Sequence, residues 1–84
     1  MDDSLYTIYT ARNCQWCVKA IDIMGNLGLD LNVISIRHNK EAIAVLQTLN
    51  LNTVPQIFKG ETLIGGYDDM INHLYKKGLL TRST

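Results

Sequence analysis

Several residue types are scarce in this chain, and their scarcity excludes whole classes of function. The sequence has two cysteines, one proline, a formal net charge of zero and no basic run longer than Lys76-Lys77. Because nucleic acids and anionic membrane surfaces are bound through basic patches, we expect neither as a partner. No apolar run approaches the length of a membrane-spanning helix.

The N-terminal residues Met1-Asp2-Asp3-Ser4 are acidic where a secretory leader would be basic, so we expect a cytoplasmic protein. Two cysteines so close together in a reducing compartment indicate redox chemistry or metal binding rather than a structural staple. A length of 84 residues, with 46% hydrophobic and 19% charged residues, predicts one globular domain over residues 1–84.

Strand and helix patterns alternate along the chain. The predicted strands cover residues 5–10, 31–36, 56–59 and 62–64, and the predicted helices cover residues 14–27, 40–49 and 68–77. The order βαβαββα predicts an α/β fold in which the first two strands pair in parallel through a helical crossover. Asn39 is expected to cap the second helix, and Gly60 to take a positive φ in a hairpin turn.

The apolar spacing within each predicted helix indicates which residues face the core. We expect these to be Val18, Ile21, Met24 and Leu27, then Ala42, Ile43, Leu46 and Leu49, then Met70, Ile71 and Leu74. His38 and His73 are expected to be solvated, and their spacing does not fit a zinc site with the cysteines.

Cys14-Gln15-Trp16-Cys17 lies where the first strand pattern gives way to a helix pattern, which places Cys14 at a helix N-terminus. Unpaired N–H groups and the positive end of the helix dipole stabilise an anion there, and the thiolate is the attacking form of cysteine. A reactive thiol is therefore expected at Cys14. A lone CxxC is weak evidence, because zinc and iron–sulfur sites use it too.

Three motifs together give the chain a resemblance to the glutaredoxins over almost its whole length. They are Cys14-Gln15-Trp16-Cys17 after Tyr9-Thr10, Thr53-Val54-Pro55-Gln56-Ile57-Phe58, and Ile64-Gly65-Gly66-Tyr67-Asp68-Asp69. The resemblance implies a thioredoxin-like fold, with a four-stranded mixed sheet flanked by three helices. It also implies a monomeric, glutathione-dependent thiol–disulfide oxidoreductase that acts on protein disulfides and glutathionylated proteins, with ribonucleotide reductase as one plausible acceptor.

The resemblance also assigns roles to residues. Cys14 would attack and Cys17, one helical turn behind it, would resolve. Residues expected to bind glutathione are Arg12, Trp16, Thr53, Val54, Pro55, Gly66, Tyr67 and Asp68. In the family the proline is cis and faces the active cysteine, the residue before it pairs with the cysteinyl backbone, and the helix start holds the γ-glutamyl carboxylate. From local sequence alone, an ordinary turn is the better interpretation of Pro55, and Asp68 can act as a helix cap as well as bind a ligand.

The chain departs from the family pattern in three places. Gln15-Trp16 stands where many glutaredoxins have Pro-Tyr, and Ala11 stands where a lysine is common, so Arg12 is the substitute cation. The usual partner of the glycyl carboxylate has no clear match at Leu51 or Asn52, which leaves Arg37.

Two alternatives therefore stay open beside the glutathione-dependent enzyme. One is a module that shares a [2Fe–2S] cluster between two protomers, each supplying its first cysteine and one glutathione. The other is a glutaredoxin-like electron donor reduced by thioredoxin reductase. No metal site within one chain is expected.

Overall fold

Seven elements follow one another in the order predicted from the sequence. A computed structural model describes residues 4–81, so the acidic N-terminal residues 1–3, on which the expected absence of a leader depends, lie outside the described part. The elements are β1 (Tyr6–Thr10), α1 (Gln15–Asn26), β2 (Leu31–Ser35), α2 (Lys40–Thr48), β3 (Gln56–Lys59), β4 (Thr62–Gly65) and α3 (Tyr67–Lys76). Each predicted element is confirmed, with ends that differ by at most one residue.

The four strands form one mixed sheet in the order β2-β1-β3-β4. β1 pairs with β2 in parallel, as the βαβ pattern predicts, and with β3 in antiparallel fashion, and β3 pairs with β4 through a tight turn. Gly60 in that turn has φ +57°, and the Asn39 side chain accepts the Ala42 N–H at 3.0 Å, so both local predictions are confirmed. The predicted thioredoxin-like architecture is confirmed as well.

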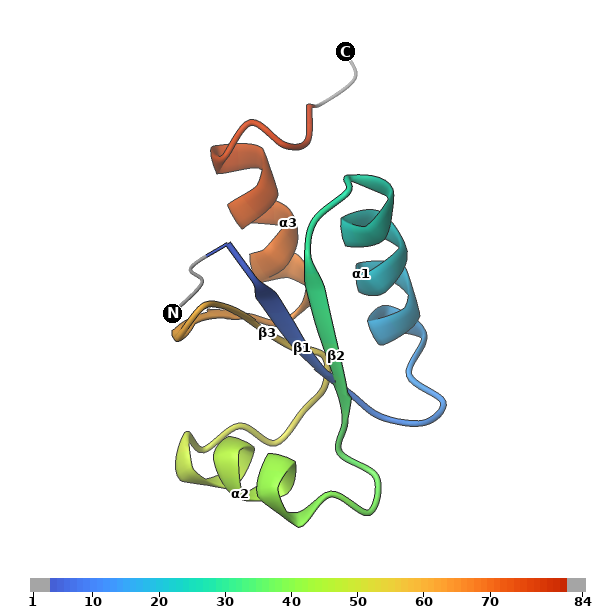
Figure 1. Cartoon of the computed structure of the whole chain (residues 1–84), viewed down its shortest axis with the longest axis vertical. Helices are drawn as coiled ribbons and strands as arrows, with labels where there is room; N and C mark the ends of the chain where they lie inside the picture. Colours follow the sequence, from blue (N-terminus) through green and yellow to red (C-terminus); the bar gives the residue numbers. More distant parts are fainter. Residues whose placement is uncertain (1–3, 82–84) are drawn as a thin grey trace.

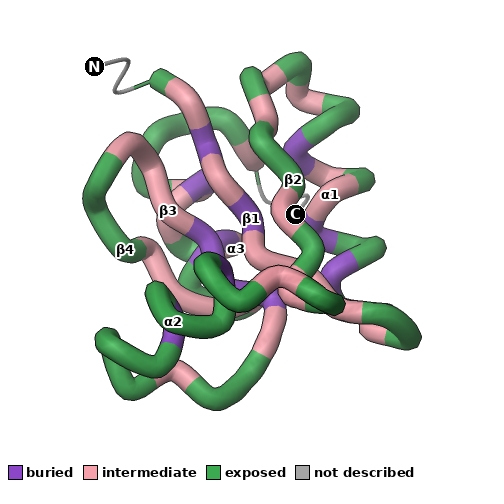
Figure 2. The backbone as a smooth tube through the Cα atoms, turned by 60° about the horizontal axis from the view of Figure 1, so that its bottom comes forward, coloured by how far each residue is buried: buried purple, intermediate pink, exposed green. Residues whose placement is uncertain are grey.

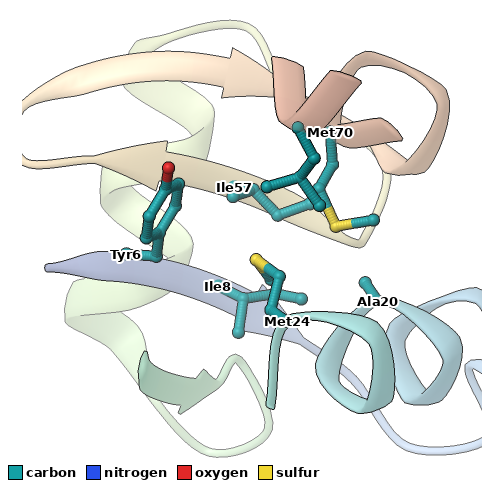
Figure 3. Close-up of a cluster of buried hydrophobic side chains, with 7 residues drawn as sticks. Tyr6, Ile8, Ala20, Met24, Ile57 and Met70 are labelled. Atoms are coloured by element: carbon teal, nitrogen blue, oxygen red, sulfur yellow. The ribbon is translucent and has the colours of Figure 1, made fainter. Parts of the chain in front are cut away.

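The core lies between the sheet and two helices, α1 and α3 (Figures 1 and 3). Strand alternation directs Tyr6 and Ile8 of β1 and Ile57 of β3 to this face, where helix residues cover them. The helix residues in this cluster are Ala20, Met24, Met70 and Leu74. Since α1 and α3 both pack here, the loop before α1 and the loop before α3 are held close to each other.

The predicted buried face of α1 is partly wrong. Val18 is 58% exposed, whereas Cys17, Ala20 and Met24 are buried. The buried stripe is rotated by about one position because small side chains allow α1 to approach the sheet closely. The rotation buries Cys17, the second cysteine.

α2 lies apart from α1 and α3 and is mostly exposed (Figures 1 and 2). Ala42 and Leu46 are buried as predicted, but Ile43 is 37% and Leu49 46% exposed, so half of the predicted face is wrong. The buried part of α2 is therefore a narrow stripe, because this short helix packs less extensively than α1 and α3 do. Within residues 4–81 no helix has the length and apolarity that crossing a bilayer requires.

His73 is not the solvated side chain that its sequence position suggests. Its Nε2 lies 2.9 Å from the hydroxyl of Tyr6, and the two rings meet edge to face. Burial, followed by the charges of Lys77 and Lys59, lowers the pKa of His73. His38 is exposed, as expected, with φ +54° in the loop before α2.

Candidate functional site

The two cysteines form a disulfide at the start of α1. Cys14 is the N-cap residue, and its Sγ accepts the backbone N–H of Cys17 at 3.2 Å. Cys14 is half-buried while Cys17 is 1% exposed. A nucleophile from outside the protein can therefore reach Cys14 more easily than Cys17.

The loop that carries the only proline lies against this disulfide. The Val54–Pro55 peptide bond is cis, Pro55 is buried, and the carbonyl oxygen of Val54 lies 3.7 Å from Cys14 Sγ. Gln56, which is 6% exposed, stabilises the loop by donating a hydrogen bond from Nε2 to the Thr53 hydroxyl at 3.3 Å. The role of Gln56 was not foreseen, although a glutamine at the first position of a strand inside a TVPQ motif was the available signal.

The Gly65-Gly66 pair turns the chain from β4 into α3. Gly65 has φ +126°, a conformation that favours glycine, and a Cβ added there would overlap the side chain of Asp69. Asp69 accepts the N–H of Gly66 through Oδ2 at 3.3 Å. A Cβ on Gly66 would lie 3.6 Å from the carbonyl oxygen of Pro55, so the helix start and the proline loop are direct neighbours.

Trp16 connects the cysteine loop to the same helix start. Its ring centroid is 4.9 Å from that of Tyr67, with the planes at 52°, and Lys19 Nζ lies 4.7 Å from the Trp16 ring. Trp16 is nevertheless 46% exposed. The geometry therefore makes Trp16 part of a wall that extends from the cysteine loop to the start of α3.

These segments enclose a groove beside the disulfide with a volume of about 430 Å³. The residues that line it are Trp16, Thr53, Val54, Pro55, Gly66, Tyr67, Asp68 and Asp69. Seven of the eight residues predicted to bind glutathione are thus brought together. The size is in the range of small-molecule sites, and we name this feature the active-site groove.

Arg12 is the predicted residue that the structure does not bring to this groove. It is exposed in the loop before Cys14 and is not among the lining residues. Arg37 is also exposed and outside the lining. Among the described residues that line the groove none is a lysine or arginine, so the N–H groups at the start of α3 are its main attraction for an anion.

No group of three or more histidine, cysteine, aspartate or glutamate side chains in residues 4–81 is arranged to hold a metal ion. Cys14 and Cys17 are bonded to each other, and neither His38 nor His73 lies among the residues lining the active-site groove. The bonded cysteine pair at the start of α1 is suited to thiol–disulfide exchange, in which a thiolate attacks one sulfur of a disulfide and expels the other.

Comparison with known proteins gives a consistent result. A family model described as Glutaredoxin matches residues 6–64. A glutaredoxin from Pseudomonas aeruginosa is 38% identical over 64 residues, which cover 75% of this chain and 76% of that protein. The hybrid peroxiredoxin hyPrx5 of Haemophilus influenzae is 34% identical over 64 residues, but the match spans 76% of this chain and only 27% of that longer protein.

Among solved structures, the glutaredoxin-like NrdH-redoxin of Escherichia coli superposes with a TM-score of 0.72 at 31% identity, over 83% of this chain and 93% of that one. The family match, the sheet topology and the disulfide at the helix start agree with one another. The chain therefore belongs to the glutaredoxin family of thiol–disulfide oxidoreductases, with Cys14 and Cys17 as its redox-active pair.

Proposed function

We propose that this glutaredoxin takes its electrons from glutathione and reduces protein disulfides and glutathione mixed disulfides. The observation that carries the proposal is the active-site groove, whose lining extends from Val54, a contact of Cys14, to the N-terminus of α3. A bound glutathione would pair its cysteinyl backbone with Val54 and place its γ-glutamyl carboxylate at the N–H groups of α3. Asp68, exposed in the first turn, would meet the ammonium group of the same glutamyl residue.

The dithiol route follows from the unequal exposure of the two cysteines. Cys14 thiolate attacks one sulfur of the substrate disulfide, and the other sulfur leaves as a thiolate that takes up a proton. Cys17 loses its proton and attacks Cys14 Sγ in the mixed disulfide, which releases the second substrate thiol and forms the Cys14–Cys17 bond. One glutathione thiolate then opens this bond at Cys14, and a second attacks the glutathione sulfur, giving glutathione disulfide and free Cys14.

The monothiol route needs only Cys14. Its thiolate attacks the glutathione sulfur of a glutathionylated protein, the protein thiol leaves, and a second glutathione regenerates Cys14 with release of glutathione disulfide. Cys17 takes no part in these steps.

The two cysteine variants test the proposal. Cys14→Ser is expected to abolish both reactions, whereas Cys17→Ser should lose protein disulfide reduction and keep deglutathionylation. Activity is measured with glutathione as sole reductant on a low-molecular-weight mixed disulfide and on a protein disulfide. Mixed-disulfide reduction by the Cys14→Ser protein would overturn the assignment of roles.

Reduction by thioredoxin reductase is a second candidate. It is favoured by the similarity to NrdH-redoxin, a protein with a thioredoxin-like activity profile. Supplying glutathione or thioredoxin reductase as the only reductant separates the two candidates, and turnover with the reductase but not with glutathione would refute ours. A cytoplasmic location, monomeric state and ribonucleotide reductase as acceptor remain predictions from sequence and resemblance.

A shared [2Fe–2S] cluster remains the third prediction, and it rests on Gln15 alone. A single chain presents one accessible cysteine, Cys14, so a cluster would need a second protomer and glutathione thiols. Anaerobic reconstitution with iron, sulfide and glutathione, followed by an ultraviolet–visible spectrum, decides it. A colourless product would exclude the cluster.

A further inference from the structure

A second groove, with a volume of about 590 Å³, lies between β4 and α3. Neither cysteine lines it, so it has no role in the thiol–disulfide exchange described above. One wall is formed by Lys59 and residues 62–64 of the hairpin, and the other by Asp69, Asn72, His73, Lys76 and Lys77 of α3 and its C-cap. The helix residues follow the spacing i, i+3, i+4, i+7 and i+8, which is one continuous stripe of an α-helix. We name this feature the basic groove.

The basic groove is positively charged. Three of the chain's eight lysine and arginine residues, Lys59, Lys76 and Lys77, line it, although the chain has no net charge. Asp69 is the only carboxylate among the described lining residues, and it already accepts the Gly66 N–H. Burial, followed by the charges of Lys77 and Lys59, lowers the pKa of His73, which favours the neutral form of the imidazole in this groove.

The other wall is an open strand edge. β4 is the last strand of the sheet, next to β3 only, so alternate backbone N–H and C=O groups on its outer side have no strand partner within residues 4–81 (Figure 2). Successive side chains of a strand point to opposite faces, yet three consecutive residues of β4 line this groove. The groove therefore borders the edge of β4 and not only one of its faces.

From these observations we propose that the basic groove binds an extended acidic segment of a partner protein, which adds to β4 as a further strand. The stripe from Asp69 to Lys77 is about 12 Å long at 1.5 Å per helical residue, a length that roughly four extended residues span. Acidic side chains at alternate positions of such a segment would face Lys76 and Lys77, and the segment's backbone would pair with the edge of β4.

The basic groove is a neighbour of the active-site groove, because Asp69 lines both. A partner with a disulfide at Cys14 could thus place a neighbouring acidic strand in the basic groove. Binding itself requires neither glutathione nor the cysteines, so it can be measured whether or not the proposed reductant is correct.

The probe is a fluorescein-labelled peptide Thr-Glu-Thr-Glu-Thr, with the Gln-for-Glu peptide as its control. Fluorescence anisotropy should show binding of the acidic peptide and at least several-fold weaker binding of the neutral one. Exposed charge pairs contribute modestly, so the charge reversal Lys76→Glu is expected to weaken binding about four- to tenfold. Lys40→Glu on α2 changes the net charge by the same amount and is expected to leave binding nearly unchanged. Circular dichroism verifies that both variants are folded.

Nitrogen–proton correlation spectra during the titration locate the peptide. Amide shifts are expected at residues 62–64 and 72–77. Equal weakening by Lys76→Glu and Lys40→Glu, shifts confined to the active-site groove, or the same shifts with inorganic phosphate alone would each overturn the proposal. The titration is repeated with Asp2→Asn/Asp3→Asn, because these acidic residues lie outside the described part, and the dependence on Lys76 should persist.

Discussion

Asp68 and Asp69 are adjacent acidic residues in the first turn of α3. The structure predicts that Asp69 caps the helix, whereas Asp68 is available to a ligand. Both are exposed and both face the positive end of the helix dipole. Of the two, Asp69 is the one whose side chain accepts a hydrogen bond, from the Gly66 N–H at 3.3 Å. Asp68→Ala and Asp69→Ala each remove one negative charge from the same helix turn. A comparison of the two variants therefore separates the effect of the hydrogen bond from the effect of the charge.

The expected magnitudes follow from these contacts. Each variant loses a charge–dipole interaction worth about 0.3–1 kcal/mol. Asp69→Ala also loses one hydrogen bond, worth about 0.5–1.5 kcal/mol net, so it should unfold more easily than Asp68→Ala by about that difference. In a domain of this size, 1 kcal/mol corresponds to a fall in melting temperature of about 4–8 °C.

The functional effect is expected in the opposite order. If Asp68 meets the ammonium group of glutathione, Asp68→Ala should raise the KM for glutathione about two- to fivefold with little change in kcat, because an exposed ion pair is lost equally from ground and transition states. Asp69→Ala should change KM less at temperatures where it is folded.

Urea denaturation and steady-state kinetics on the same preparations measure both quantities. The reasoning is refuted if Asp68→Ala destabilises as much as Asp69→Ala, since the hydrogen bond would then contribute nothing. A larger KM effect from Asp69→Ala would refute the assignment of Asp68 to glutathione while leaving the capping role intact.

Three further predictions concern the scaffold. Gly65→Ala should lower the free energy of unfolding by about 1–3 kcal/mol or more, because φ is +126° and the Asp69 side chain occupies the position of the added Cβ. Gly66 has φ −84°, so Gly66→Ala should lower it by only about 0.5–1 kcal/mol, as measured by urea denaturation. Burial lowers the pKa of His73 in the folded protein, so the unfolded chain binds a proton at this histidine more readily. The neutral imidazole is therefore compatible with folding above about pH 6.5, and the free energy of unfolding should fall as the pH is lowered below that value. His73→Gln should therefore lose less stability than wild type between about pH 7.5 and 5.5, and an equal loss would contradict this. Leu46→Ala, at a buried position, should lower the free energy of unfolding by about 2–5 kcal/mol, whereas Leu49→Ala, at an exposed one, should change it by no more than about 0.5 kcal/mol. Equal losses would contradict the burial of α2 described above.

Much of the fold was predictable because it depends on local pattern. Hydrophobic period, glycine position and capping residues act within a few residues of chain, so the seven elements and the Asn39 cap are confirmed. The buried faces were harder to predict. Val18 and Leu49 fit a helical apolar stripe but are exposed, because the depth and rotation of each helix depend on the sheet beneath it.

The sequence by itself determined that two cysteines stand one helical turn apart at the start of a helix, and which three motifs surround a redox site. Only the tertiary structure decided that Cys14 is accessible and Cys17 buried, that Val54 contacts Cys14 from forty residues away, and that Arg12 lies outside the groove. It also paired Tyr6 with His73 and brought three lysines, from β3 and from the end of α3, to one groove. The physical reason is that such proximities arise from strand pairing and helix packing between distant segments, and local sequence preferences contain no information about them.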